Sequence, residues 1–160
     1  MTKKKFSRTL AALAAVVLLS GQTEPLDSLD DVFDKSVLII ETKGSGCFKF
    51  DVHLAMTRDQ QRRGLMFVRK MDQWSGMLFV YRQASVLSMW MKNTYLPLDI
   101  LFARGDGHIS SVESNTEPLS LKSISAIEPV NFVLELNAGV AAKLGIDDGS
   151  RLIFDQPQSN

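Results

Sequence analysis

Apolar and polar residues alternate along much of the chain in the pattern that half-buried β-strands produce. Residues 37–41 and 48–55 are predicted as two strands joined by a glycine-containing turn at residues 43–46. On the second strand, one face is apolar and the other polar, formed respectively by Phe48, Phe50, Val52 and Leu54 and by Lys49, Asp51 and His53. This alternation predicts a hairpin with one face in the core and the other in water.

Two short helices interrupt the strand pattern. Thr57 and Gln60 have the spacing of a capping box, which predicts a helix that begins after Thr57 and ends at Gly64. Asn137 is predicted to cap a second helix at residues 138–144. Further strands are predicted at residues 77–81, 86–92, 98–103, 108–113, 130–136 and 151–154. The predicted fold is therefore mainly β, a compact antiparallel barrel or sandwich of about eight or nine short strands with two short helices.

The first 21 residues have a different composition from the rest. Four basic residues and no acidic residue precede an unbroken apolar run from Leu10 to Leu19. A basic segment followed by an apolar run too short to span a bilayer comfortably is typical of a secretory signal peptide. We therefore expect residues 1–21 to be a signal peptide and the protein to be periplasmic or secreted. A retained N-terminal membrane anchor is the alternative.

The remaining chain is predicted to hold a flexible leader at residues 22–36, rich in acidic and polar residues, and a single domain at residues 37–156. Removal of 21 residues from the 160 leaves 139, a size that suits one hydrophobic core. The signal segment contains four of the 18 basic residues and none of the 18 acidic ones, so the rest has 14 basic and 18 acidic residues. This balance argues against nucleic acid as a partner, and against membrane contact after signal cleavage.

Cys47 is the single cysteine, so the chain cannot form an internal disulfide. We interpret it as a small strand residue. A reactive thiol and a disulfide between chains remain open alternatives.

Residues 88–102 stand out because polar side chains interrupt an apolar segment, and buried polar groups need partners. Asp99 lies within a predicted strand of apolar residues, where a carboxylate requires a cation or backbone donors. Lys92 and Arg63 are the predicted cations, and Asn93 is expected to fix the turn that follows it.

Two interpretations of this polar cluster are open. Arg63, Lys92, Asn93 and Asp99 could form a buried structural ion pair and a turn lock. They could instead form a site in which Lys92 and Arg63 hold an anionic or sugar-like ligand while Asp99 accepts a hydrogen bond or acts as a general base. The second interpretation includes an enzyme with hydrolase-like acid–base chemistry at Asp99 and Lys92. The motifs of triad hydrolases, zinc sites and nucleotide-binding loops are absent from the sequence, and no cofactor is predicted.

The methionines that follow Met1 are clustered between residues 56 and 91, at Met56, Met66, Met71, Met77, Met89 and Met91. The thioethers of Met89 and Met91, with the imidazole of His53, would suit Cu(I) outside the cytoplasm. The competing interpretation is that methionine fills irregular gaps in the core beside aromatic rings.

Trp74 falls in a predicted turn at residues 72–76. It is a candidate surface platform for a ligand or partner, or a lid packed on the core. The long connection at residues 114–127 is of the kind that often lies over a site.

Three blocks of the sequence closely resemble the bacterial and archaeal "domain of unknown function 192" family. They are residues 57–67 with Arg63-Gly64-Leu65-Met66-Phe67, residues 76–102 with Trp90-Met91-Lys92-Asn93-Thr94 and Pro97-Leu98-Asp99-Ile100, and residues 133–146 with Val133-Leu134-Glu135-Leu136. The likeness extends over about residues 43–154. The resemblance implies a small β-rich domain, commonly exported, and no established activity.

The observations favour an exported ligand- or partner-binding module that uses a conformationally fixed polar cluster of Arg63, Lys92, Asn93 and Asp99. Its partner would be a small ligand or an envelope protein. An enzyme and a soft-metal Cu(I)-binding domain are the alternatives.

Overall fold

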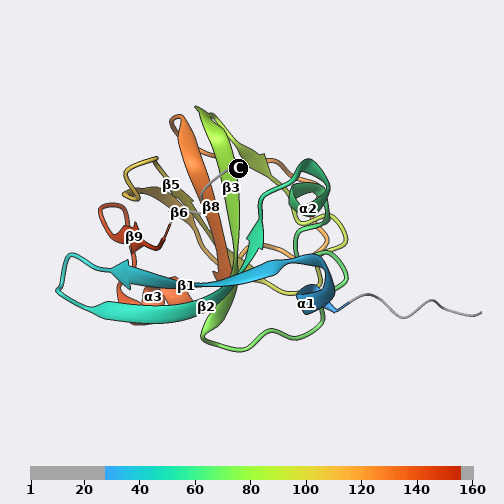
Figure 1. Cartoon of the computed structure of the whole chain (residues 1–160), viewed down its shortest axis with the longest axis horizontal. Coiled ribbons are helices and arrows are strands. Elements are labelled where there is room, and N and C mark those ends of the chain that lie inside the picture. Colours follow the sequence, from blue (N-terminus) through green and yellow to red (C-terminus); the bar gives the residue numbers. More distant parts are fainter. Residues whose placement is uncertain (1–27, 156–160) are drawn as a thin grey trace, which may run out of the picture.

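The computed structural model describes residues 28–155, which form a strongly curved and nearly closed β-sheet (Figure 1). Seven strands make one sheet in the order β6-β5-β8-β3-β2-β1-β9, and β4 and β7 pair in a small second sheet. The predicted mainly β fold is confirmed, with nine strands and three short helices in the described part. In chain order the elements are α1 (Leu29–Val32), β1 (Asp34–Glu41), β2 (Cys47–Ala55), α2 (Arg58–Arg63), β3 (Ser75–Ser85), β4 (Ser88–Met89), β5 (Leu98–Ala103), β6 (Ile109–Glu113), β7 (Ile124–Ser125), β8 (Val130–Asn137), α3 (Val140–Leu144) and β9 (Arg151–Ile153).

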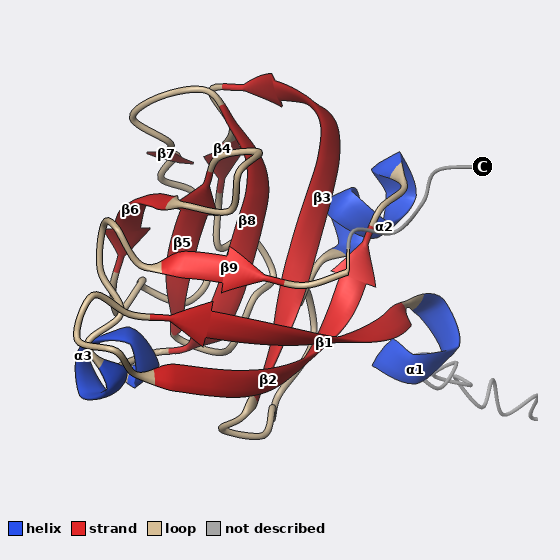
Figure 2. Cartoon of the chain, turned by 60° about the vertical axis from the view of Figure 1, so that its left-hand side comes forward, coloured by secondary structure: helices blue, strands red, loops and turns tan. Residues whose placement is uncertain are grey.

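The short strand β9 brings the two edges of the large sheet together. It pairs antiparallel with β1, and it also lies against the turn that joins β5 to β6 (Figure 2). The backbone amide of Leu152 donates to the carbonyl of Gly107 at 2.8 Å, and that of Ile109 donates to the carbonyl of Ser150 at 2.9 Å. These bonds cover edge groups that would otherwise be free to pair with another chain.

Strands β2 and β3 are parallel, with Val52 opposite Gly76, which departs from the purely antiparallel sheet predicted. A parallel pair cannot be joined by a tight turn, because the chain must return to the starting edge before the second strand begins. The return here runs through α2 and residues 64–74. The predicted capping box at its start is confirmed, since Thr57 accepts from the Gln60 amide and Gln60 accepts from that of Thr57.

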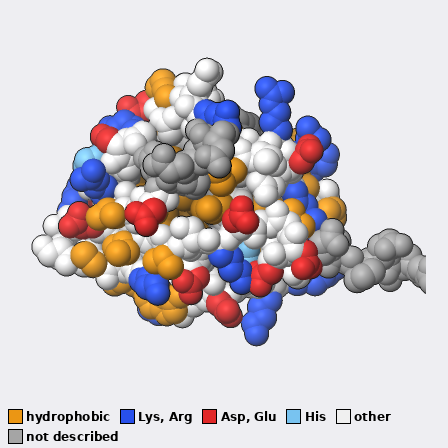
Figure 3. All heavy atoms as spheres, in the orientation of Figure 1, with side chains coloured by type: hydrophobic (Ala, Val, Ile, Leu, Met, Phe, Trp, Pro, Cys, Tyr) orange, Lys and Arg blue, Asp and Glu red, His pale blue; other side chains and the backbone are white. Residues whose placement is uncertain are grey.

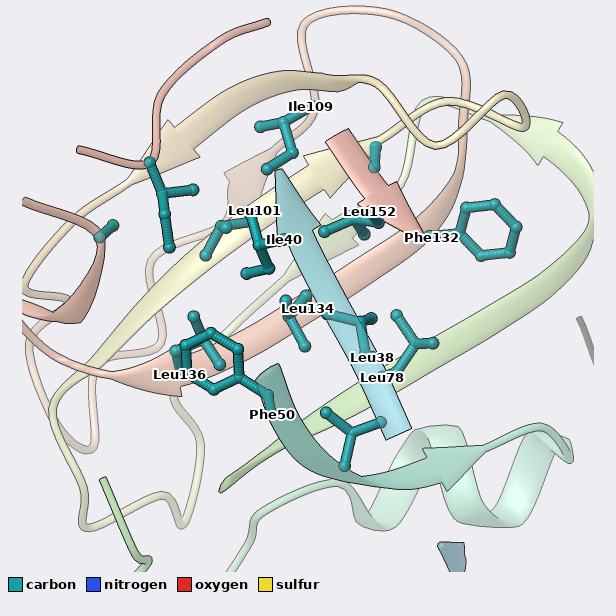
Figure 4. Packing of buried hydrophobic residues seen from close by; sticks show 14 of the residues in the cluster. Leu38, Ile40, Phe50, Leu78, Leu101, Ile109, Phe132, Leu134, Leu136 and Leu152 are labelled. Atoms are coloured by element: carbon teal, nitrogen blue, oxygen red, sulfur yellow. The ribbon is translucent and has the colours of Figure 1, made fainter. Parts of the chain in front are cut away.

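The sheet separates two hydrophobic clusters. The first fills the inside of the curve and includes Leu38, Phe50, Leu101 and Leu134, all fully buried (Figure 4). The second lies on the outer face of the central strands and includes Met77, Phe79, Met91 and Ile100. Every residue of β5 is buried, because both faces of that strand are covered.

The structured domain begins closer to the N-terminus than the sequence predicts. Within the segment predicted as a flexible leader, residues 28–36 form α1 and the beginning of β1. Phe33 anchors this segment in the second cluster, with 3% of its surface exposed. A single helical turn is too short to show a periodic apolar face, which is why the pattern does not reveal it. The predicted signal peptide at residues 1–21 lies outside the described residues.

Two local predictions are wrong. The strand predicted at residues 86–92 is reduced to the two residues of β4. Asn137 does not cap α3, which begins after Gly139; its side-chain amide instead donates to the carbonyls of Met71 and Asp72. Within residues 28–155 no helix has the length and the apolar character needed to cross a bilayer.

Candidate functional site

Asp99, on β5, is fully buried, and backbone amides rather than a cation satisfy it. Its Oδ1 accepts from the amide of Asn115 and its Oδ2 accepts from the amide of Ala141, both at 2.9 Å. None of the ion pairs between described residues includes Asp99. The predicted ion pair with Lys92 or Arg63 is therefore wrong, since two charge-assisted bonds from the backbone take its place.

Lys92 is exposed at the surface. Its Nζ lies 5.0 Å from the centroid of the Trp90 ring, a cation–π distance. Lys92 and Asp99 therefore do not form the single acid–base site that the sequence left open.

Asn93 holds the turn before β5 against the turn after α2. It adopts a φ of 55°, and its carbonyl accepts from the amide of Phe67 at 2.8 Å. Its side-chain nitrogen lies 4.0 Å from the sulfur of Met66, whose amide donates to the carbonyl of Arg63. Arg63 and Asn93 thus belong to neighbouring segments in direct contact. Asn93 connects its own turn to the turn after α2, whereas the prediction had its side chain fixing the turn at residues 93–97.

Arg63, the last residue of α2, lines a cleft of about 770 Å³ between α1, the β1–β2 hairpin and the turn after α2. The apolar part of this cleft is formed by Leu29, Val37, Val52, Phe67, Val68 and Met71. Its charged side chains are Asp30, Lys35, Asp51, His53, Arg63, Lys70 and Asp72. A concave, partly apolar site with a few convergent charges is the usual form of a small-molecule site.

One carboxylate of the cleft is already neutralised. Asp30 contacts the Nζ of Lys35 at 2.6 Å and the Nε2 of His53 at 2.8 Å. The hydrogen bond from Lys35, followed by that from His53, lowers the pKa of Asp30 below its ordinary value. These contacts attach α1 to the hairpin, because Asp30 is on α1 while its partners are on β1 and β2.

Two buried nitrogen atoms of the cleft have no hydrogen-bond partner within the described part of the chain. They are the Nε of Arg63 and the Nδ1 of His53. Unpartnered buried polar atoms are uncommon in folded proteins, and each costs free energy.

The residues of the predicted soft-metal site make other contacts in the structure. The hydroxyl of Thr116 lies 3.3 Å from the sulfur of Met91, which is buried, and His53 contacts Asp30. Met89 is partly buried in β4 and packs against the second cluster. In residues 28–155 there is no group of three or more His, Cys, Asp or Glu side chains placed to hold a metal ion.

Trp74 packs partly on the core, and its predicted role as a platform for a ligand or partner stays a prediction. Its ring packs on that of Phe50 with 5.5 Å between centroids, yet 46% of the residue remains exposed. Cys47 is exposed at the start of β2.

Glu135 is not singled out in the sequence analysis, although it is, like Asp99, a buried acidic residue in an apolar strand. It lies on β8 between Met77 of β3 and Ile100 of β5, with 4% of its surface exposed. Burial disfavours its charged form and raises the pKa of Glu135 to about 8. Burial also raises the pKa of Tyr81, with a smaller contribution from the charge of Glu135. A lone acid in an otherwise apolar strand was the signal that could have found it.

The fold and the cleft define a small β-domain with a candidate binding site and no recognisable catalytic constellation in its described part. Residues 38–154 match the model of the DUF192 family, described as "Uncharacterized ACR", and the chain belongs to this family. No curated protein matches the chain.

Two solved structures are similar along most of their length. A protein from Sinorhizobium meliloti 1021, described as a candidate transcription regulator, is 41% identical with a TM-score of 0.75; the match covers 76% of this chain and 95% of that one. A protein of unknown function from Novosphingobium aromaticivorans DSM 12444 is 31% identical with a TM-score of 0.73, and the match covers 93% of this chain and 99% of that one.

Proposed function

We propose that this protein is an exported binding module that holds a small ligand bearing an acidic group in the cleft beside Arg63. The observation that carries the proposal is the Nε of Arg63, which is buried in the cleft wall without a hydrogen-bond partner in the described chain. A guanidinium in that state lowers the stability of the free domain, and an acidic ligand in the cleft would compensate its positive charge.

The chemistry of arginine narrows the ligand class. Its planar guanidinium donates two parallel hydrogen bonds to a carboxylate or phosphate, and it keeps its charge when buried. Asp30 is already shared by Lys35 and His53, so it does not compete strongly for Arg63. Lys70 adds a second, exposed cation at the cleft.

The apolar side chains of the cleft indicate the rest of the ligand. Phe67 and Met71 belong to the turn that borders the cleft, and Val37, with 46% of its surface exposed, lies on β1. An aliphatic or aromatic body would bury surface against these residues, while its acidic group reaches Arg63. We therefore expect an organic acid with an apolar body to bind better than an inorganic anion.

Neither of the other functions is favoured. The hydrolase-like alternative requires solvent or substrate to reach Asp99, which is fully buried and accepts two backbone hydrogen bonds. The description of the S. meliloti relative as a candidate transcription regulator is not extended to this chain, because the predicted signal peptide would carry the protein away from DNA.

The test compares the purified protein with Arg63→Gln and with Arg62→Gln as a matched control. Arg62 is the preceding residue of α2, is exposed and contacts Asp59 at 3.4 Å. Melting curves are recorded with a panel of aliphatic and aromatic carboxylates, and with the corresponding neutral amides. Binding raises Tm, since a ligand at about 100 times its Kd adds about 2.7 kcal/mol to the free energy of unfolding.

We expect at least one carboxylate, and not its amide, to raise the Tm of the wild type and of Arg62→Gln. The shift should disappear in Arg63→Gln, whose own Tm should be no lower than that of the wild type because an unpartnered group is removed. Equal shifts in all three proteins, or no shift with any carboxylate, would show that the cleft does not have this function.

A further inference from the structure

A surface of aromatic and cationic side chains lies next to the cleft. Lys92 is placed over the ring of Trp90, and the guanidinium of Arg69 lies 4.5 Å from the ring centroid of Tyr95. The rings of Phe67 and Tyr95 meet edge to face with 6.4 Å between centroids. We call this surface the aromatic–cationic face; it consists of Phe67, Arg69, Trp90, Lys92, Tyr95, Leu119, Leu121 and Lys122.

Backbone hydrogen bonds hold the three loops of this face side by side. The amide of Phe67 donates to the carbonyl of Asn93, and the amide of Leu119 donates to that of Thr94. The amide of Met91 donates to the carbonyl of Ser120, which connects the same loops a second time. The three loops that carry the face therefore adjoin, at the end of the molecule that carries α2 (Figure 1).

Several bulky side chains of this face are exposed to solvent. The exposed fractions are 48% for Trp90, 53% for Leu119 and 70% for Leu121. Phe67 and Leu119 have φ values of 68° and 63°, which bulky residues rarely adopt. A contiguous exposed apolar patch is unusual on a monomeric soluble protein and marks a surface that binds something.

The residues that define the face include three cations, Arg69, Lys92 and Lys122, and no acid. Between residues 58 and 92 there are two acidic residues, Asp59 and Asp72, and seven basic ones, namely Arg58, Arg62, Arg63, Arg69, Lys70, Arg82 and Lys92. In the orientation of Figure 1, several blue Lys and Arg side chains lie at the upper right of the molecule, and others are spread over the rest of the visible side (Figure 3). The face itself is therefore positively charged despite the acidic excess of the domain, and its partner should be anionic.

The residue types of the face match the surface of a lipid bilayer. Trp and Tyr rings settle at the level of the lipid headgroups, Lys and Arg reach phosphates, and exposed Leu side chains enter the acyl boundary. The described chain also begins at this end, because α1 lies beside α2 in Figure 1.

From these observations we infer that the aromatic–cationic face docks onto a bilayer containing anionic phospholipids. This interaction uses side chains other than Arg63 and does not depend on the ligand proposed for the cleft. It also revises the expectation of no membrane contact after signal cleavage, which rested on net charge alone.

The test is cosedimentation with vesicles of phosphatidylcholine, with and without phosphatidylglycerol. The protein begins at residue 22, so the apolar run cannot bind the vesicles by itself, and circular dichroism confirms that it is folded. Trp90→Ala should weaken binding about tenfold, and Lys92→Gln about fivefold. Trp74→Ala and Lys49→Gln are the matched controls, exposed residues outside the face, and should leave binding unchanged.

A second measurement detects contact between Trp90 and the lipid directly, without relying on a loss of vesicle binding. The chain has two tryptophans, so Trp74→Phe leaves Trp90 as the single indole and Trp90→Phe leaves Trp74. Brominated phosphatidylglycerol should quench the fluorescence of Trp90 and leave that of Trp74 unaffected.

The inference is overturned if the protein fails to bind vesicles containing phosphatidylglycerol, or if Trp74 is quenched as strongly as Trp90. It is also overturned if Trp90→Ala abolishes a dimer, or the binding of an acidic protein or DNA, while vesicle binding is unchanged. Loss of carboxylate binding in Arg63→Gln leaves vesicle binding intact, so failures of the two proposals can be distinguished.

Discussion

The carboxylate of Asp99 joins β5 to the start of α3, because its Oδ2 accepts a hydrogen bond of 2.9 Å from the backbone amide of Ala141. The first amides of a helix have no partner within the helix, and a capping side chain usually satisfies one of them. The residue at the cap position of α3 is Gly139, which has no side chain. Asp99 therefore acts as a cap supplied from a neighbouring strand.

Replacement of Asp99 by Asn should destabilise the domain by about 2 to 4 kcal/mol. The amide nitrogen of Asn would face one of the two backbone donors, at Asn115 or Ala141, and leave that donor buried without an acceptor. Urea unfolding measures the change. Asp51→Asn, at an exposed position of β2, is the control and should change the free energy of unfolding by less than about 0.5 kcal/mol. Equal stability of Asp99→Asn and the wild type would show that these bonds contribute little.

The stability of the domain should fall as the pH rises from about 4.5 to about 8. Folding raises the pKa of Glu135 from 4.5 to about 8 by burial, so the unfolded chain loses this proton at a lower pH than the folded one. The contribution of Glu135 is complete below the unfolded pKa and is lost as the pH approaches the folded one. The loss is at most about 1.4 kcal/mol for each pH unit.

Glu135→Gln isolates the contribution of Glu135 to this pH dependence, because the glutamine amide stays neutral over the whole pH range. Unfolding in urea at a series of pH values should show a smaller decrease in stability for Glu135→Gln than for the wild type between these limits. Identical pH profiles for the two proteins would mean that Glu135 is not desolvated as the fold indicates.

Gly76 permits close contact between β3 and β8, so Gly76→Ala should cost about 1 to 3 kcal/mol. A Cβ at this position would lie 2.7 Å from the backbone oxygen of Glu135 and 2.8 Å from a methyl carbon of Leu136. Gly44→Ala is the matched control, since a Cβ at that position meets nothing within 4 Å. The Tm of the two variants measures the difference, and a similar Tm for both would contradict the importance of this contact.

The sequence by itself determined most of the strands and the capping box of Thr57, as well as the buried character of β5. These features depend on residues a few positions apart, whose alternation or spacing records which face is buried. The same local information is too weak for the single turn of α1 and for the two residues of β4. It also misassigned Asn137, whose partners at Met71 and Asp72 are 66 and 65 residues away.

The partners of the polar residues were decided by the tertiary structure alone. Asp99 and Ala141 are 42 residues apart, and they meet because β5 and β8 are neighbours in the sheet and α3 follows β8. Arg63 and His53 line the same cleft because β2 and β3 are parallel, which requires the chain to return through α2 before β3 begins. The chain shows which side chains need a partner, since burial of polar groups is costly wherever it occurs. Which partner each one finds depends on strand order and on crossovers, and these bring together residues that no local pattern connects.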